Sequence, residues 1–469
     1  MALSLGGCSA AARITGQAPV ELPLPAGIEV AFNHRKDRQY RSPVSGLMRN
    51  GDNLEQMLLD TIARAEREIL VAVQELSLPE VSRALVAKHR AGVRVKVVLE
   101  NNYSRPWSEE HLVDLDSRQR SRHFTLKALA DSNRDGVLTL EEKQQGDAVA
   151  ILRLGGVPQI DDTADGSAGS GLMHHKFLVV DGRWVVTGSA NFTPSCIHGD
   201  LDNVRTRGNA NHLLRIDSRP LAAVFAKEFA HLWGDGPGGQ PDSRFGLHKE
   251  NGELQKVTVG NTTVEVMFAP HRTRDLRNGL AHIETQLAQA KKRLDLNLFV
   301  LSAQNLSNRI AQLHRQGVKI RVLVDAGFAY RSFSELLDLL GVAMPDHRCK
   351  LEAGNAPLAQ PLAGVGAPRL SSGDKLHHKV AVIDDRTVIT GSFNWSLAAA
   401  HTNDETLIIL HSPALAAHFN REMDRLWQGA ELGLTPRLQR KLQKSRQLCG
   451  HGELRAAKLT WPLLPQLTS

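Results

Sequence analysis

Two copies of one polar pattern, each attached to an apolar segment, carry the residues whose types and spacing could do chemistry. Residues 174–193 read HHKFLVVDGRWVVTGSANFT, and residues 377–396 read HHKVAVIDDRTVITGSFNWS. Both fit H-x-K-x4-D-x6-G-S-x-N, so an imidazole, an ammonium, a hydroxyl and an amide recur at fixed offsets. The residues concerned are His174, Lys176, Ser189 and Asn191 in the first copy and His377, Lys379, Ser392 and Asn394 in the second.

Strand alternation predicts which of these side chains point together. His174 and Lys176 should share one face of a strand, whereas His175 and its counterpart His378 should face away and support or pack. The G-S-x-N turn follows a second apolar strand, so a hairpin would return the hydroxyl and the amide to the same end. Two copies that face each other would surround one cavity with two imidazoles, two cations and four neutral polar groups.

This set of groups fits phosphodiester chemistry that needs no catalytic cofactor. Lysine and asparagine donors suit the non-bridging phosphate oxygens, where charge grows in a phosphorane-like transition state. One imidazole can attack phosphorus, while the other protonates the departing oxygen and then activates water. The motif aspartates, Asp181 and Asp384, lie a strand length away from the histidines. We expect them to be structural and to pair with charge outside the site.

Both motifs resemble the HKD signature of the phospholipase D superfamily, and the repeat covers nearly the whole chain. The resemblance implies an α/β fold with two similar domains, each a sheet sandwiched by helices, related by a pseudo-twofold axis with the active site between them. It implies that His174 is the nucleophile and His377 the general acid, an order that could be reversed. The residues that would hold the phosphoryl oxygens are Lys176, Lys379, Asn191 and Asn394, helped by Ser189 and Ser392.

Members of the superfamily often carry a carboxylate after the motif that orients a histidine. Glu405 is the candidate here, and the matching position of the first half is Asn211. The two histidines should therefore differ electronically.

The elements that must position the motifs also occur twice. The segment AGVRVKVVLENN (91–102) matches QGVKIRVLVDAG (316–327), and PLAAVFAKEFAHLWG (220–234) parallels ALAAHFNREMDRLWQ (414–428). Strands that alternate with helices indicate an α/β domain present twice, so a monomer suffices for a complete active site. The expected divisions are an N-terminal segment 1–45, domains 46–233 and 256–430, a Gly/Pro linker 234–255, and a basic C-terminal tail 431–469.

An insertion near 107–154 distinguishes the first half. It contains DSNRDGVLTLEE (131–142), which fits the EF-hand calcium loop D-x-[DN]-x-[DN]-G-x5-E. The ligands would be Asp131, Asn133, Asp135, the Val137 carbonyl, Thr139 through water, and Glu142. We expect a structural Ca²⁺ that takes no part in the chemistry; the alternative is a polar turn between two helices.

Composition suggests the kind of partner. Lys and Arg number 57 against 50 Asp and Glu, which favours polyanions or an anionic membrane surface. The densest basic run, RLQRKLQKSR (437–446), is also typical of a solvated helix face. No stretch of 18 apolar residues predicts a transmembrane helix. The four cysteines lie far apart, and their spacing predicts neither a metal site nor a disulfide framework.

The first residues leave localisation open between two alternatives. SLGGC (4–8) is similar to the lipidation site of bacterial lipoproteins, yet only seven residues precede Cys8. Either translation starts further upstream and the protein is an exported, membrane-anchored lipoprotein, or the similarity is chance and the protein is cytoplasmic.

Two substrate classes fit the motifs. Hydrolysis of a phospholipid headgroup is slightly favoured, because two HKD copies on one chain resemble lipid enzymes. The alternative is a metal-independent DNA or RNA endonuclease, for which the positive charge and nearby aromatic residues speak. Those aromatic residues are Phe192, Phe328, Tyr330 and Trp395. Transfer to an alcohol, as in cardiolipin synthesis, is less expected, and an inactive binding module would require the loss of motif residues that are all present.

Overall fold

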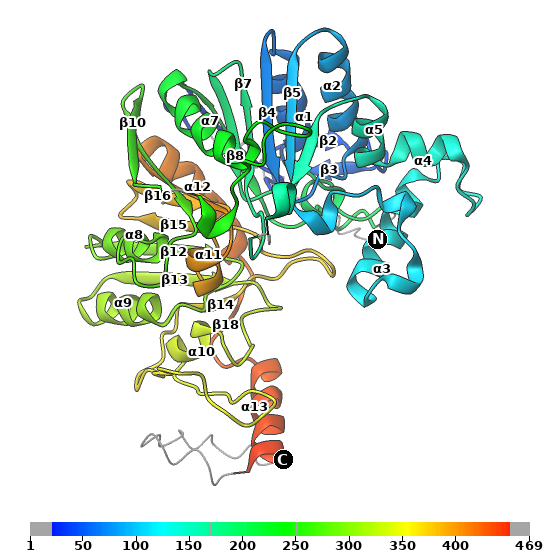
Figure 1. Cartoon of the computed structure of the whole chain (residues 1–469). Helices are drawn as coiled ribbons and strands as arrows, with labels where there is room; N and C mark the ends of the chain where they lie inside the picture. Colours follow the sequence, from blue (N-terminus) through cyan, green and yellow to red (C-terminus); the bar gives the residue numbers. More distant parts are fainter. Residues whose placement is uncertain (1–20, 168–169, 202, 250–251, 451–469) are drawn as a thin grey trace, which may run out of the picture.

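Two large mixed β-sheets with the same central strand order lie in the two halves of the molecule (Figure 1), and β2 (Gln39–Arg41) pairs with β3 (Met48–Asn50) in a separate two-stranded sheet. The computed structural model describes residues 21–167, 170–201, 203–249 and 252–450. The first sheet runs β1 (Ile28–Phe32), β9 (His212–Asp217), β8 (Trp184–Gly188), β7 (Lys176–Val180), β4 (Glu68–Val73), β5 (Arg94–Leu99), β6 (Gln159–Asp161). The second runs β10 (Gln255–Val259), β11 (Thr262–Ala269), β17 (Glu405–His411), β16 (Thr387–Gly391), β15 (Lys379–Ile383), β12 (Arg293–Leu298), β13 (Lys319–Val324), β14 (Val365–Ala367), β18 (Glu431–Leu432).

Parallel pairing within each half follows from the helical crossovers. Strands β4 and β5 are parallel, as are β12 and β13, while both motif hairpins are antiparallel. The helices of the first half are α1 (Leu54–Ala63), α2 (Pro79–Arg90), α3 (Ser117–Ala130), α4 (Leu140–Gly146), α5 (Ala148–Leu154), α6 (Pro194–Ile197) and α7 (Arg219–Trp233). Those of the second are α8 (Gly279–Leu287), α9 (Gln304–Arg315), α10 (Glu335–Leu339), α11 (Leu397–His401), α12 (Pro413–Trp427) and α13 (Pro436–Cys449). The expected α/β fold with two similar domains is confirmed.

The two halves share one hydrophobic core. Phe177 and Val179 of β7 belong to the same buried cluster as Val380 and Val382 of β15, together with apolar residues of α7 and α12. Leu178, between Phe177 and Val179, packs instead into the outer core of the first half. Strand alternation thus separates a shared inner core from an outer core, and the inner core fixes how the two motifs face each other.

Helices α7 and α12 start in the same way. The hydroxyl of Ser218 accepts a hydrogen bond from the backbone N–H of Leu221, and Ser412 does the same for Leu415. Each serine is an N-cap, and a proline follows within the first turn, where its missing N–H costs nothing. Both helices thereby begin at equivalent points against the two sheets.

Several expected boundaries change. Strand β1, which lies before residue 46, pairs along its whole length with β9 at the edge of the first sheet. After residue 430, β18 pairs with β14, and Leu438 and Leu442 of α13 pack into the core of the second half. Residues 28–32 and 431–449 are therefore parts of the two domains rather than separate terminal segments.

The spacing of the cysteines gave no indication of a disulfide, but the structure contains one. Cys349 and Cys449 form a disulfide between α13 and the loop that precedes β14, and Cys196 is a buried free thiol. A separation of 100 residues gives no local signal, because only the fold brings the two cysteines together.

The insertion of the first half is a helix–loop–helix formed by α3 and α4. Gly146 packs so tightly on Ala130 that a Cβ at this position would lie 2.3 Å from the Ala130 Cβ. Asp147 then ends α4 and caps α5, accepting hydrogen bonds from the backbone N–H groups of Val149 and Ala150. Residues Gly146 and Asp147 thus break the second flanking helix.

Cys8 and the lipoprotein-like sequence lie outside the described residues. Among the helices that the structure does describe, none is both long and apolar enough to cross a membrane.

Candidate active site

Two antiparallel hairpins bring the motif residues back to one end of each sheet. In the first, β7 pairs with β8 so that Phe177 lies opposite Thr187, and Ser189 and Asn191 follow directly. In the second, Ala381 of β15 lies opposite Ile389 of β16. Both hairpins are those expected from the sequence pattern.

Backbone contacts join the two hairpin ends. The N–H of His174 donates to the carbonyl of Asp404 at 2.9 Å, and the N–H of His377 donates to the carbonyl of Ala210 at 3.0 Å. These reciprocal contacts place the start of each motif against the strand that follows the other motif. The two histidines, 5% and 6% exposed, thereby meet at the boundary between the halves.

Each motif histidine is oriented by the opposite half. The His174 Nδ1 lies 2.7 Å from Glu405 Oε2, and the His377 Nδ1 lies 3.0 Å from Asn211 Oδ1. The candidate carboxylate Glu405 is therefore brought to His174, and its counterpart Asn211 is brought to His377. A charged partner on one side and a neutral partner on the other make the two imidazoles electronically different.

The two motif serines support the orienting residues. Ser392 Oγ donates to Glu405 Oε2 at 2.6 Å, and Ser189 Oγ donates to Asn211 Oδ1 at 2.8 Å. Each serine oxygen also accepts a backbone N–H, from Thr406 and His212 respectively. That these hydroxyls help to hold phosphoryl oxygens stays a prediction; here their hydrogen bonds are made to the orienting side chains.

The motif lysines are buried cations with few partners. Lys176 Nζ donates to the His174 carbonyl at 2.7 Å, and Lys379 Nζ donates to the His377 carbonyl at 2.7 Å. Within the described parts of the chain neither ammonium forms an ion pair. Burial lowers the pKa of Lys176 to about 8, and burial together with the Lys176 charge lowers the pKa of Lys379 well below its usual value. Two poorly compensated cations favour an anion between them.

The same charges act on the histidine and the carboxylate. Burial and the charges of Lys176 and Lys379 lower the pKa of His174 well below its ordinary value, so the imidazole is neutral at neutral pH. Burial raises the pKa of Glu405 to about 7, against the opposing effect of Lys176. Above about pH 7 the ionised Glu405 carboxylate can therefore accept a hydrogen bond from the Nδ1–H of neutral His174.

The motif asparagines complete the polar surface. Asn191 Nδ2 donates to Gln74 Oε1 at 3.1 Å, and Gln74 Oε1 lies 3.4 Å from Lys176 Nζ. The Oδ1 atoms of Asn191 and Asn394 have no hydrogen-bond partner within the described structure. Gln74 was not predicted as a site residue, because it directly follows β4 and lies outside both motifs.

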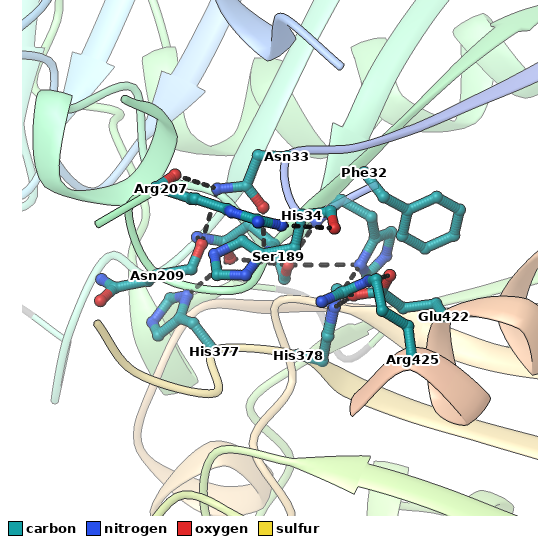
Figure 2. Close-up of polar contacts among 12 residues, drawn as sticks. Phe32, Asn33, His34, Ser189, Arg207, Asn209, His377, His378, Glu422 and Arg425 are labelled. Carbon is teal, nitrogen blue, oxygen red and sulfur yellow. Dashed lines mark hydrogen bonds and ion pairs between the residues drawn. The ribbon is translucent and has the colours of Figure 1, made fainter. Parts of the chain in front are cut away.

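The second histidine of each pair faces away from the site, as expected. His175 contacts Thr406 Oγ1 at 2.9 Å and Glu228 at 3.0 Å. Figure 2 shows that His378 points toward Glu422 and Arg425, whereas His377 points away from them. The His378 Nε2 lies 2.9 Å from Glu422, and its Nδ1 lies 2.9 Å from the Nδ1 of His212. The glutamates sit in register in the two repeated helices α7 and α12, a signal that was present in the sequence.

The motif aspartates tie the hairpins to the preceding strands. The Asp181 carboxylate accepts three hydrogen bonds of 2.8 Å from the backbone N–H groups of residues 66–68. Asp384 accepts three from residues 291–293. Their structural role is as expected, but the direct partners are backbone amides rather than side-chain charges.

One buried group has the ligand types of a metal site. His175, Glu228 and Asp404 are the only three such side chains in the described regions whose ligand atoms lie within 4.8 Å of one another. Lys249 already contacts both carboxylates there, with its Nζ 2.6 Å from Asp404 Oδ1. This ammonium supplies the positive charge that the carboxylates require, and it joins the interdomain linker to both halves.

Hydrogen bonds within residues 131–142 hold the candidate calcium loop in place. Asp131 accepts hydrogen bonds from the backbone N–H groups of Asp135 and Gly136, and Gly136 has a φ of +79°. The Glu142 carboxylate accepts from Ser132 and Thr139, so it closes a capping box at the start of α4. The oxygen donors and the glycine turn fit Ca²⁺. The carboxylates of Asp131, Asp135 and Glu142 do not converge to within 4.8 Å of one another.

Comparison with known proteins agrees with this geometry. The family described as "Cardiolipin synthase, PLD-like domain" matches residues 58–233 and 283–427, which make up more than half of the chain. A mitochondrial cardiolipin hydrolase of Xenopus tropicalis is 31% identical over 142 residues, 30% of this chain and 58% of that protein. A phospholipase D of Rickettsia felis is 28% identical over 137 residues, 29% of this chain and 58% of that protein. The matched segments thus span less than two thirds of either relative.

A solved structure has the same fold over nearly the full length. The phosphatidylserine synthase of Haemophilus influenzae Rd KW20 covers 91% of this chain and 95% of its own, with a TM-score of 0.52 and 14% identity. At that identity the likeness concerns the fold alone. The two matched segments contain both motif hairpins, so the chain belongs to the family of phospholipase D-like proteins.

Proposed function

We propose that this protein hydrolyses phosphodiesters, phospholipid headgroup esters foremost, through a covalent phosphohistidine. The observation that carries the proposal is the pair of buried lysines that form no ion pair with any described residue, close to two histidines that the opposite halves orient. A phosphodiester anion would supply the missing negative charge, and its non-bridging oxygens would accept from Lys176 and Lys379.

The orienting partners favour His174 as the nucleophile. With its Nδ1–H directed to Glu405, the His174 Nε2 lone pair is free to attack phosphorus. His377 has only the neutral Asn211 oxygen at its Nδ1, so its imidazolium is less stabilised and is the stronger acid. The negative charge of a bound phosphate would raise the pKa of His377 and allow it to carry the proton.

Two displacements then complete the reaction. In the first, a bond forms from His174 Nε2 to phosphorus, the ester P–O bond breaks, and His377 gives its proton to the departing oxygen. In the second, neutral His377 takes a proton from water, the resulting hydroxide attacks phosphorus, and the N–P bond breaks. The products are a phosphomonoester and an alcohol; an alcohol in place of water would give transfer instead.

The relatives support a lipid substrate, because those matched are a cardiolipin hydrolase and a phospholipase D. A nuclease is the alternative. The four aromatic residues near the motifs could either stack on bases or pack in the core, and Phe192, Tyr330 and Trp395 are buried, so they are not available for stacking. Their burial weakens the nuclease alternative.

A side-by-side assay in EDTA tests the proposal. Phosphatidylcholine and phosphatidylglycerol vesicles and single- and double-stranded DNA are incubated with the protein, with His174→Ala as the inactive variant. Replacement of the exposed His111 by alanine is the matched control. We expect release of headgroup and phosphatidic acid by the wild type and by the control only. Cleavage of DNA alone would replace the proposal with a nuclease.

We also propose that Ca²⁺ binds the 131–142 loop as a structural ion. The ligands would be the side chains of Asp131, Asn133, Asp135 and Glu142, the Val137 carbonyl, and Thr139 through water. The donor types and the left-handed Gly136 support the proposal, and Glu142 would have to exchange its capping hydrogen bonds for the ion.

Export is a further part of the proposal. The Cys349–Cys449 disulfide supports it, because disulfides persist mainly in oxidising compartments. Lipidation of Cys8 would require a charged and apolar leader encoded in frame upstream of Met1. A stop codon directly upstream would exclude that anchor.

A further inference from the structure

The two halves differ at the residue that directly follows β4 and β12 beside the site. Gln74 and Phe299 occupy equivalent positions, since each donates its backbone N–H to the carbonyl of the second motif histidine of its own half. Gln74 accepts from Asn191 and lies near Lys176, whereas the Phe299 ring lies 4.8 Å from the His377 ring and 4.9 Å from Lys379 Nζ. The His174 side of the site is thus polar, and the His377 side is aromatic.

The aromatic side continues outward from His377. The ring of Phe299 lies 4.6 Å from that of Phe328, which lies 6.5 Å from that of Phe333. Phe299 and Phe328 are half-buried, and Phe333 is 39% exposed. We call Phe299, Phe328 and Phe333 the aromatic row; it connects the general acid with the surface.

A basic surface borders the outer end of the aromatic row. The Arg331 guanidinium lies 4.8 Å from the Phe328 ring centre and 6.0 Å from that of Phe333. Arg437 of α13 lies over Tyr330, and Lys441 of α13 donates to the Tyr330 carbonyl. Leu438 and Leu442 of α13 belong to the same buried core as Tyr330 and as Leu336 of α10, which begins just after the aromatic row.

Helix α13 is held so that its charges point outward. It contains five Lys and Arg residues and no Asp or Glu. Leu438 and Leu442 are its buried face, and the disulfide at Cys449 fixes its far end. The exposed cations of the helix are Arg437, Arg440, Lys441 and Lys444.

From this juxtaposition we propose that an anionic phospholipid bilayer docks on α13 and Arg331, and that Phe333, the exposed end of the aromatic row, enters the apolar part of the bilayer interface beside the site. The inference rests on the proposed function and deepens it. Lysine and arginine attract anionic headgroups, while aromatic rings prefer the membrane interface. A membrane fits the row better than stacked bases do, because Arg331 already lies over the rings of Phe328 and Phe333.

The binding test uses the full chain with vesicles of phosphatidylcholine, with and without phosphatidylglycerol. The double change Arg440→Gln with Lys444→Gln removes two outward charges that make no contact with the aromatic row. We expect about 10- to 30-fold weaker binding to the anionic vesicles. Lys227→Gln with Lys256→Gln removes the same charge from exposed positions on α7 and β10 and should bind within about twofold of wild type.

The catalytic test compares a soluble diester, bis(p-nitrophenyl) phosphate, with the anionic vesicles. Phe333→Ser should lower turnover on vesicles and leave the soluble diester unaffected. Leu276→Ser, a change at an 85% exposed apolar residue elsewhere, should affect neither. Wild-type vesicle binding and turnover in the α13 and Phe333 variants would overturn the inference, as would a selective loss of DNA binding. A wild type that hydrolyses neither substrate would instead overturn the proposed function.

Discussion

The two halves of the site contain the same hairpin, but different side chains surround the histidine and the lysine in each half. In one, a glutamate from the opposite half holds His174, and a glutamine lies beside the lysine; in the other, an asparagine holds His377, and a phenylalanine lies beside the lysine. Because both histidines are otherwise equally buried, the difference comes from their partners. The duplicated pattern therefore provides two imidazoles, and single side chains outside the pattern give them different hydrogen-bond partners.

The largest expected effect separates the roles of the two histidines. His174→Ala and His377→Ala should each lower hydrolysis of an ordinary lipid diester by at least about 10³-fold. With p-nitrophenyl esters, whose leaving group needs no proton, His377→Ala should still release one equivalent of nitrophenol and accumulate phosphohistidine. Rapid-quench kinetics and acid-labile labelling measure this. An equal burst from His174→Ala would reverse the assignment.

The orienting residues should give the next largest effect. Glu405→Gln removes the carboxylate from His174 and should lower kcat by about 10²- to 10⁴-fold with little change in KM. Asn211→Gln keeps a neutral amide beside His377 and should cost far less, so steady-state kinetics of the two variants measure the asymmetry directly. Equal losses would show that the charge difference is not used.

The pH dependence of kcat/KM should follow the ionisation of Glu405 and Lys176, which lie on the His174 side of the site. Below about pH 7 Glu405 is protonated and no longer accepts from His174, so kcat/KM should rise as pH increases through that value. Above about pH 8 Lys176 loses its charge, so kcat/KM should fall again. Lys176→Arg should extend the alkaline limb, because a guanidinium stays protonated. An alkaline limb unchanged in this variant would contradict the role given to Lys176.

The smallest expected effect concerns the insertion, which only the first half carries. Ca²⁺ should raise Tm by a few degrees, and Asp131→Ala with Glu142→Ala should abolish that rise. Hydrolysis in EDTA should stay unchanged, because the ion takes no part in the chemistry. Scanning calorimetry with and without Ca²⁺ measures the shift, and an identical calcium response in the double variant would remove the loop from the metal proposal.

Features with a local period could be predicted from the sequence. The hairpins, the shared face of His174 and Lys176, and the match of Glu405 to Asn211 all depend on positions counted along one strand. Because the segment is repeated, each of these positions occurs twice, and a chance match is easily excluded.

Features set by long-range packing could not be predicted. Strand β1 has no motif, and the Cys349–Cys449 disulfide joins residues 100 apart. Gln74 and Phe299 look unrelated until their strands are superposed within equivalent sheets. The serines were assigned to phosphate because the motif places them near it, yet the fold gives them a partner from the same half that competes for their protons.

The exchange of orienting residues between the halves has a consequence for biosynthesis. A ribosome adds His174 long before it reaches Glu405, and His174 has no carboxylate beside its Nδ1 until the second half has folded against the first. Under the proposed mechanism the nascent first half would be inactive, and nearby lipid would not be hydrolysed. Under the same mechanism, hydrolysis would begin only after the two halves have docked, so activity would indicate that docking is complete.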